Sequence, residues 1–197
     1  MATVLEPSQS GYPIRFDVAY PEELSRWLIF VKWLLAIPHY VILYFLQILF
    51  SLITLIAFFA ILFTKTYPRD LFRYAVGTRR WQNNVNAYTS LMRDEYPPFS
   101  WEPGEYAAAY EADYPDELNR WLPLIKWLLA IPHFIVLALL GIAWLFVLIA
   151  AFFAILFTKR YPRSLFDFGV GVLRWSERVT MYVYLATDAY PPFSLKP

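Results

Sequence analysis

Two long uncharged blocks dominate the pattern of hydrophobic and polar positions along this chain. The first runs from Trp33 to Phe63 and the second from Trp127 to Phe157, and neither contains a lysine, arginine, aspartate or glutamate. Each block is longer than the roughly 18 to 20 apolar residues that suggest a membrane segment. We therefore expect both blocks to be helical and to be solvated by lipid.

A second, amphipathic pattern follows each block. Its apolar residues recur at alternating steps of three and four positions, whereas Arg73, Arg80 and Arg174 fall on the opposite side. This spacing predicts a helix that lies in the membrane interface or packs on another subunit, with an ordinary helix folded onto its own neighbours as the alternative. The apolar positions are Leu71, Tyr74, Thr78, Trp81, Val85, Tyr88 and Met92, and then Leu165, Phe168, Val172, Trp175, Val179, Tyr182 and Ala186.

The two blocks belong to an internal duplication. Residues 17–100 align without a gap with residues 111–194, at a constant offset of 94, and about half of the aligned positions are identical. The motifs RWL, KWLLAIPH, AFFAILFTK, YPR, RW and YPPFS occur in this order in both copies. The chain thus divides into an N-terminal tail (1–16), a first membrane module (17–100), a linker (101–110) and a second membrane module (111–197).

Each block can turn back as a hairpin or continue as one helix. A hairpin places every lysine and arginine on one side of the membrane, as basic loops prefer, so we favour it. In the alternative, Pro38 and Pro132 begin new helices, because proline suits the first helical position; residues 22–36 then form a tilted interfacial helix. Both versions predict an all-α membrane protein of two tandem direct-repeat modules. Each module is an apolar helical hairpin, or one kinked spanning helix, followed by an amphipathic interfacial helix.

The composition agrees with a membrane protein and excludes several other classes. Hydrophobic residues make up 59% of the chain and charged residues 17%, whereas soluble domains have about 25% charged residues. The 17 lysines and arginines nearly balance the 16 acidic residues, so no basic surface is expected to bind nucleic acid. Cysteine is absent, which excludes disulfides and thiolate metal sites. The first residues lack the pattern of a secretory signal, so we expect insertion to depend on the internal blocks.

Tryptophan and lysine residues mark the expected membrane border. Indole rings favour the headgroup level, and a lysine stem allows its ammonium group to reach back toward lipid phosphates. We expect eight residues at this lipid interface: Trp27, Lys32, Trp33, Trp81, Trp121, Lys126, Trp127 and Trp175.

The only two histidines, His39 and His133, each end a copy of KWLLAIPH. Their place near a helix N-terminus favours neutral imidazole, which can ligate the iron of a haem or the magnesium of a chlorophyll-type pigment. The structural alternative is that each ring caps backbone groups at the proline kink or bonds a lipid headgroup. No serine or carboxylate lies near either histidine in sequence, so we expect no catalytic site, no enzyme activity and no other metal site.

YPPFS closes both copies, and its tandem prolines end the amphipathic helix. We expect this segment to pack back onto its module, with an exposed recognition motif as the alternative.

The ordered motifs from Tyr20 to Ser194 resemble a bacterial membrane-protein family known only as a domain of unknown function, often present in tandem copies. The resemblance implies a protein of the prokaryotic cytoplasmic membrane and transfers no catalytic residue. We therefore expect a noncatalytic accessory subunit that contacts membrane lipids and other membrane subunits or copies of itself. The alternatives are a membrane-shaping protein with wedge-like hairpins and a tetrapyrrole-binding protein that uses His39 and His133.

Overall fold

The computed structural model describes residues 11–197, so residues 1–10 of the expected N-terminal tail lie outside the described part of the chain. Most of the described chain is helical, and two short strands pair in one antiparallel ribbon. The elements in chain order are β1 (Ile14–Val18), α1 (Leu28–Leu35), α2 (Ile37–Thr64), α3 (Arg69–Thr89), β2 (Ala108–Ala112), the 3-10 helix η1 (Leu122–Leu124), α4 (Lys126–Leu129), α5 (Ile131–Thr158) and α6 (Arg163–Val183).

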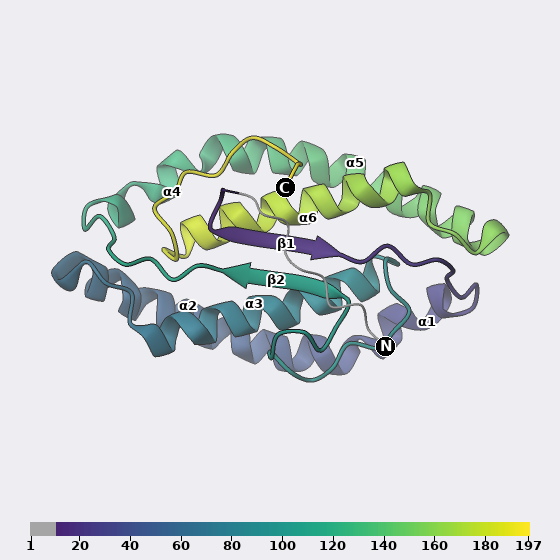
Figure 1. Cartoon of the computed structure of the whole chain (residues 1–197), viewed down its shortest axis with the longest axis horizontal. Helices are drawn as coiled ribbons and strands as arrows, with labels where there is room; N and C mark the ends of the chain where they lie inside the picture. Colours follow the sequence, from purple (N-terminus) through teal and green to yellow (C-terminus); the bar gives the residue numbers. More distant parts are fainter. Residues whose placement is uncertain (1–10) are drawn as a thin grey trace.

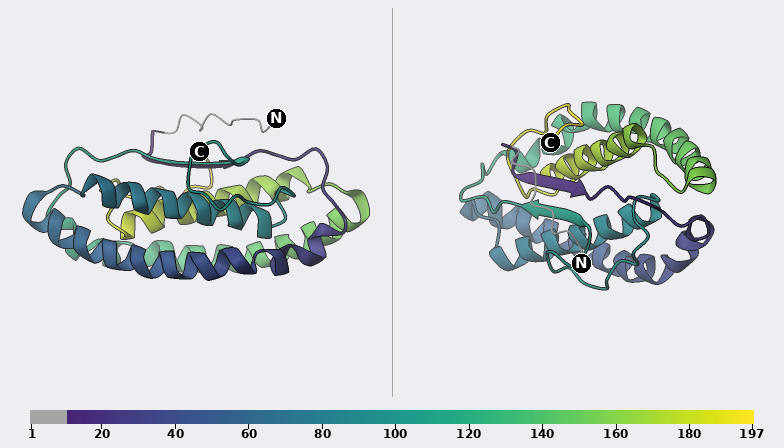
Figure 2. Two further views of the ribbon diagram at one scale, coloured as in Figure 1. Left: turned by 90° about the horizontal axis from the view of Figure 1, so that it is seen from below. Right: turned by 45° about the vertical axis from the view of Figure 1, so that its right-hand side comes forward.

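Three layers build the molecule. The long helices α2 and α5 form one outer layer, α3 and α6 form the middle layer, and the β1–β2 ribbon forms the opposite outer layer (Figures 1 and 2). The left view of Figure 2 shows α2 and α5 bowing away from the ribbon at their centres, with their ends rising toward it. The outer helical layer is therefore convex on the side away from the strands.

The two modules are related by a pseudo-twofold axis through the ribbon. Phe16 pairs with Tyr110 at the centre of the antiparallel register. The backbone bond from Ala19 N to Ala107 O repeats as the bond from Asp113 N to Pro13 O, and both measure 2.9 Å. Each strand precedes one module but packs on the other: β1 contacts α6, and β2 contacts α3 of the first module. The ribbon thus locks the two modules together.

The favoured hairpin is wrong. All but the first few residues of each apolar block form one uninterrupted helix of 28 residues, α2 or α5, and Gln47 and Ser51 lie within α2 without a turn. A break occurs earlier, where Ala36 separates α1 from α2 and Pro38 lies in the first turn of α2. The kinked-helix alternative therefore describes where the long helix α2 starts and ends, because proline lacks the N–H that would continue the α1 hydrogen-bond ladder. The helix expected over residues 22–36 is shorter than predicted, since α1 begins only at Leu28.

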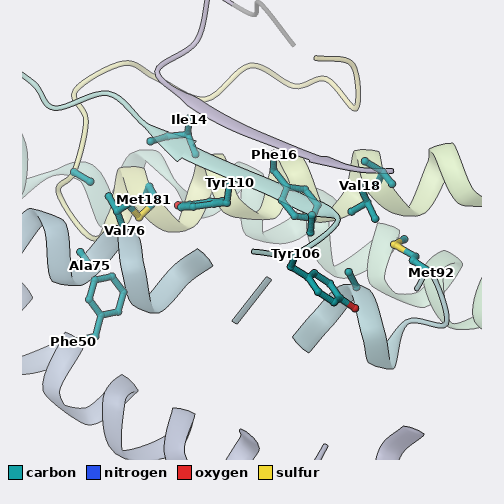
Figure 3. Close-up of a cluster of buried hydrophobic side chains, with 14 of the residues drawn as sticks. Ile14, Phe16, Val18, Phe50, Ala75, Val76, Met92, Tyr106, Tyr110 and Met181 are labelled. Atoms are coloured by element: carbon teal, nitrogen blue, oxygen red, sulfur yellow. The ribbon is translucent and has the colours of Figure 1, made fainter. Parts of the chain in front are cut away.

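The chain is mostly helical, as expected, but it is not entirely α-helical, because β1 and β2 form a ribbon across the expected tail and linker boundaries. In β1 the side chains of Ile14, Phe16 and Val18 are buried, whereas those between them are partly exposed. Figure 3 shows Phe16 and Tyr110 pointing from the ribbon toward the helices. This alternation is the usual mark of a half-buried strand, but each strand finds its partner only in the other copy.

The amphipathic helices α3 and α6 form the middle layer, between the long apolar helices and the ribbon. On α3 the predicted apolar positions Trp81, Val85 and Tyr88 are buried, and so is Gly77 on the opposite side. An added Cβ at Gly77 would lie 3.1 Å from the Trp101 side chain. Both sides of this helix are covered, so the alternative of an ordinary helix packed on its neighbours is confirmed.

Packing between the outer and middle layers differs between the copies in a complementary way. Figure 3 shows Phe50 of α2 beside Ala75 of α3. The equivalent positions in the second module are Trp144 and Gly169, and a Cβ added to Gly169 would lie 1.9 Å from the Trp144 ring. The larger indole is therefore accommodated by the loss of a methyl group on the facing helix.

We predict that Gly169→Ala lowers the free energy of unfolding by about 1–3 kcal/mol, because the new methyl group overpacks the Trp144 contact. Gly141→Ala is the matched control: Gly141 also lies within a long helix, but nothing lies within 4 Å of an added Cβ. That change should be neutral or stabilising by up to about 1 kcal/mol. Denaturant unfolding in detergent micelles measures both, and equal effects of the two substitutions would contradict the packing described.

Candidate functional site

Most of the exposed large hydrophobic side chains lie on α1, α2 and α5, and we call the surface that they form the apolar face. The buried residues of α2 form one narrow stripe from His39 to Ile61, and the remaining circumference is exposed. The most apolar 18-residue window is only 22% buried in the helical stretch Leu28–Thr64 and only 6% buried in Ile131–Thr158. Both helices are long and apolar enough to cross a membrane, and they are far less buried than the core helix of a soluble protein.

The serine and threonine hydroxyls of α2 and α5 are paired within their own helix. The side chains of Ser51, Thr54 and Thr64 on α2 donate to the carbonyl four residues earlier, at 2.7–3.0 Å. Thr158 on α5 donates to the carbonyl of Ala154 at 2.7 Å in the same way. Such internal pairing is what a polar group needs where water is absent.

Four of the expected interface tryptophans border the apolar face. Trp27 and Trp121 are 80% and 64% exposed, and Trp33 and Trp127 are similarly exposed one or two turns further along. The indole N–H of Trp33 donates to the Phe30 carbonyl at 2.7 Å, and that of Trp127 makes the equivalent bond at 2.8 Å. The rings are therefore open to the surroundings, while two of the indole N–H groups are satisfied internally.

The expected snorkelling of Lys32 and Lys126 is wrong, because both side chains are only 1% exposed. The Lys32 ammonium donates to the Arg93 carbonyl at 2.6 Å and lies 2.8 Å from the Asp94 carboxylate. Lys126 repeats this with Asp188, also at 2.8 Å. Both lysine side chains point inward because an aspartate carboxylate lies in the segment after the middle-layer helix, about 60 residues further along the chain.

These lysine–aspartate pairs join three segments. One oxygen of Asp188 faces Lys126, and the other accepts the backbone N–H of Asn119 at 2.5 Å. Burial lowers the pKa of Lys126 below its usual value, and the hydrogen bond with Asp188 acts in the opposite direction. The pair therefore fixes the start of the apolar layer to the end of the middle layer.

The two histidines lie in equivalent aromatic clusters. His39 accepts a hydrogen bond at Nδ1 from the indole N–H of Trp81 at 3.0 Å and stacks on Phe99 at 4.0 Å. His133 does the same with Trp175 at 3.1 Å and Phe193 at 4.0 Å. Trp81 and Trp175 are buried in these clusters, which corrects their expected place at the lipid interface.

The tryptophan bond determines which histidine tautomer fits. An indole N–H only donates, so Nδ1 of His39 carries the lone pair and the neutral ring bears its proton on Nε2. Axial ligation of a tetrapyrrole metal needs a histidine nitrogen with a free lone pair. The lone pair of Nδ1 accepts the tryptophan hydrogen bond, and Nε2 carries the proton, so neither nitrogen is free. The arrangement therefore fits a structural histidine better than a metal ligand, and residues 11–197 contain no group of three or more His, Cys, Asp or Glu that could hold a metal ion.

The YPPFS segments pack back onto their own modules. The hydroxyl of Tyr96 donates to the Leu35 carbonyl at the end of α1, and Tyr190 donates to the Leu129 carbonyl, both at 3.1 Å. Leu35 lies just before the proline break, where the helical ladder is interrupted. The segment therefore closes the kink, and its phenylalanine supplies the ring that covers the histidine.

A buried ion pair between α3 and α6 escaped the sequence reasoning. The guanidinium of Arg79 donates to both carboxylate oxygens of Glu177, and both side chains are largely buried. Burial lowers the pKa of Arg79, but the charge of Glu177 and its hydrogen bonds together outweigh this effect and raise the pKa. The equivalent positions hold Leu173 and Asn83. This difference in charge between the copies is the signal that could have revealed a contact between them.

We predict that Asp188→Asn lowers the free energy of unfolding by about 3 kcal/mol, because it leaves the buried Lys126 ammonium without a counter-charge. Asp70→Asn is the matched control, since the Asp70–Arg73 pair is more than three-quarters exposed. Its loss should change stability by about 0.5 kcal/mol or less. Equilibrium denaturation in micelles compares the two variants. A loss for Asp188→Asn no larger than that of the control would show that the lysine contact does not stabilise the fold.

Comparison with known proteins agrees with the duplication. A family model described as a domain of unknown function (DUF4389) matches residues 26–100 and again residues 121–194. No curated protein and no solved structure matches the chain. The two matched segments begin just before α1 and just before η1, and both end within YPPFS. The chain therefore belongs to the DUF4389 family and contains two copies of its domain.

Proposed function

We propose that this chain is a noncatalytic monotopic membrane protein that lies along one leaflet of the prokaryotic cytoplasmic membrane. The apolar face of α1, α2 and α5 is embedded among the acyl chains, and the β1–β2 ribbon stays in water. The observation that carries the proposal is that the middle layer runs beside nearly the full length of the apolar helices, since the buried stripe of α2 extends from His39 to Ile61.

An upright orientation is opposed by the charges beside the helices. If α2 crossed the bilayer, α3 and the ribbon would share its depth, with Arg79 near mid-length and the partly exposed Arg15–Asp113 pair on the ribbon. Each charge at the bilayer centre costs about 2.5–3.5 kcal/mol on insertion scales. A helix of 28 residues is also about 42 Å long, which exceeds the hydrocarbon thickness of about 30 Å. Lying flat avoids both problems.

The pseudo-twofold axis supports the same orientation. With the axis along the membrane normal, α2 and α5 lie at equal depth and the ribbon lies centrally above them (Figure 2). The basic residues before and after both apolar helices then face one compartment, as basic loops prefer. A flat orientation therefore keeps the lysines and arginines on one side of the membrane, which was the reason for expecting a hairpin, and it needs no turn inside either helix.

The polar layers suggest an accessory role. In this orientation lipid covers the molecule only on the side of α1, α2 and α5, so the exposed charged residues of α3, α6 and the ribbon remain available to a partner protein. The buried histidines sit in closed aromatic clusters, and the buried ion pairs each join elements of the fold. These features support a structural component of the membrane rather than an enzyme.

We predict that single introduced cysteines distinguish flat from upright binding, because the natural chain has none. Glu22→Cys and Thr66→Cys place thiols at the two ends of the α1–α2 unit, and Leu52→Cys places one on the apolar face. In protein bound to preformed liposomes, a membrane-impermeant maleimide added outside should modify both ends and spare Leu52→Cys. Phe146→Cys, the equivalent of Leu52→Cys, should also be protected.

The same assay shows how the proposal fails. If one end reacts only after detergent opens the vesicles, the helix crosses the bilayer. If Leu52→Cys reacts as fast as the ends do, the apolar face does not contact lipid.

A further inference from the structure

We propose that the molecule binds anionic phospholipid headgroups in a pair of equivalent pockets, one at each end of the apolar face. One pocket has a volume of about 430 Å³ and the other of about 450 Å³. Every lining residue of the first has its equivalent in the second, so the duplication builds the same pocket twice. The first is lined by Glu23, Leu24, Ser25, Arg26, Trp27 and Lys159 and the second by Glu117, Leu118, Asn119, Arg120, Trp121 and Lys65.

Each pocket forms where the two modules meet. In the first, Lys159 follows the last turn of α5, and the entry segment of the other module supplies Arg26 and Trp27. The bond from Leu24 N to the Lys159 carbonyl, at 2.8 Å, holds the two segments together. The Arg26 guanidinium is anchored on the Phe157 carbonyl at 3.1 Å. Two cationic side chains from separate segments therefore converge on one cavity.

The backbone at the lysines gives an independent reason to assign them a role. Lys159 and Lys65 cap α5 and α2 with φ of 60° and 59°, in the left-handed region. Glycine is the usual residue at such a cap, because other residues are strained there by roughly 1 kcal/mol or more. Both copies nevertheless carry lysine at this position. A charge is thus kept where the backbone would favour glycine.

The position of the pockets identifies the occupant. Trp27 and Trp121 line them and are strongly exposed. Lys159 and Lys65 place the pockets at the ends of α5 and α2, and Figure 2 shows these ends rising from the convex side of the helical layer. Indole rings favour the headgroup level. Arginine and lysine at that level bind phosphate oxygens by charge-assisted hydrogen bonds, while the acyl chains continue along the apolar face. This assignment rests on the proposed membrane orientation.

The two pockets are unequal. Lys65 donates to the Glu117 carboxylate at 2.6 Å, and this bond holds the pKa of Glu117 below its usual value. Glu23 lines the other pocket, but within residues 11–197 Lys159 makes no ion pair with it. Arg160 follows Lys159, whereas Thr66 follows Lys65. The pocket of Arg26 and Lys159 is therefore the stronger anion site.

Vesicle binding of the full chain tests the proposal. Wild type should bind vesicles of phosphatidylcholine alone and bind vesicles that contain phosphatidylglycerol more tightly. The double variant Arg26→Gln, Lys159→Gln should lose about 10- to 30-fold of this preference, as expected for two cations near the surface, with phosphatidylcholine binding unchanged. The variant Arg120→Gln, Lys65→Gln should lose less, because Glu117 already neutralises Lys65.

The control variant Arg15→Gln, Lys196→Gln removes two positive charges from β1 and the C-terminal segment, and it should keep most of the preference. An equal loss in this control would overturn the site, because net charge alone would then explain the preference. Added inorganic phosphate should compete no better than chloride at the same ionic strength; strong competition would indicate a site for free phosphate instead. If wild type binds neither vesicle type, the proposed membrane function itself fails, which is a different outcome from loss of the preference alone.

Discussion

The packing of α3 and α6 along the long apolar helices is the constraint on which the rest of the structure depends. Each long helix offers one narrow stripe to the middle layer and leaves its remaining surface apolar and exposed. The charged groups of the middle layer and ribbon lie beside the helices rather than at their ends. The apolar and polar parts of the molecule are therefore stacked as layers, and a layered molecule meets a bilayer along its surface.

The three layers are complete only when the two duplicated modules are joined. The ribbon joins a strand from before each module and packs each strand on the other module, so neither copy has a complete polar layer alone. Divergence between the copies strengthens their pairing: Arg79 and Glu177 form a buried contact that two identical copies would lack. Divergence also appears within the second module, where Gly169 leaves space for the larger side chain of Trp144.

Much of the secondary structure could be predicted from the sequence, because it depends on local pattern. The apolar blocks, the second helix after each block and the helix start at Pro38 all follow from periodicity and proline chemistry. Periodicity also shows that a helix has an apolar side, but not whether lipid or protein covers it. For this reason Trp81 could not be distinguished from Trp33, although the first bonds a histidine and the second is exposed.

The remaining errors concern contacts between residues far apart in the chain. Lys32 lies in apolar sequence, where a lysine can either reach toward water or pair with a distant carboxylate, and only the fold brings Asp94 to it. The ribbon was missed because each five-residue strand has its partner in the other copy. The two headgroup pockets could not be predicted from the sequence either, because the residues that line each pocket come from both modules.

Polarised infrared spectroscopy of the protein in oriented bilayers tests the orientation most directly, because the amide I dichroism reports the mean angle between the helices and the membrane normal. The layered structure predicts helices close to the membrane plane, with all four long helices contributing the same sign. Dichroism that placed the helices within about 40° of the normal, as in membrane-spanning bundles, would contradict it.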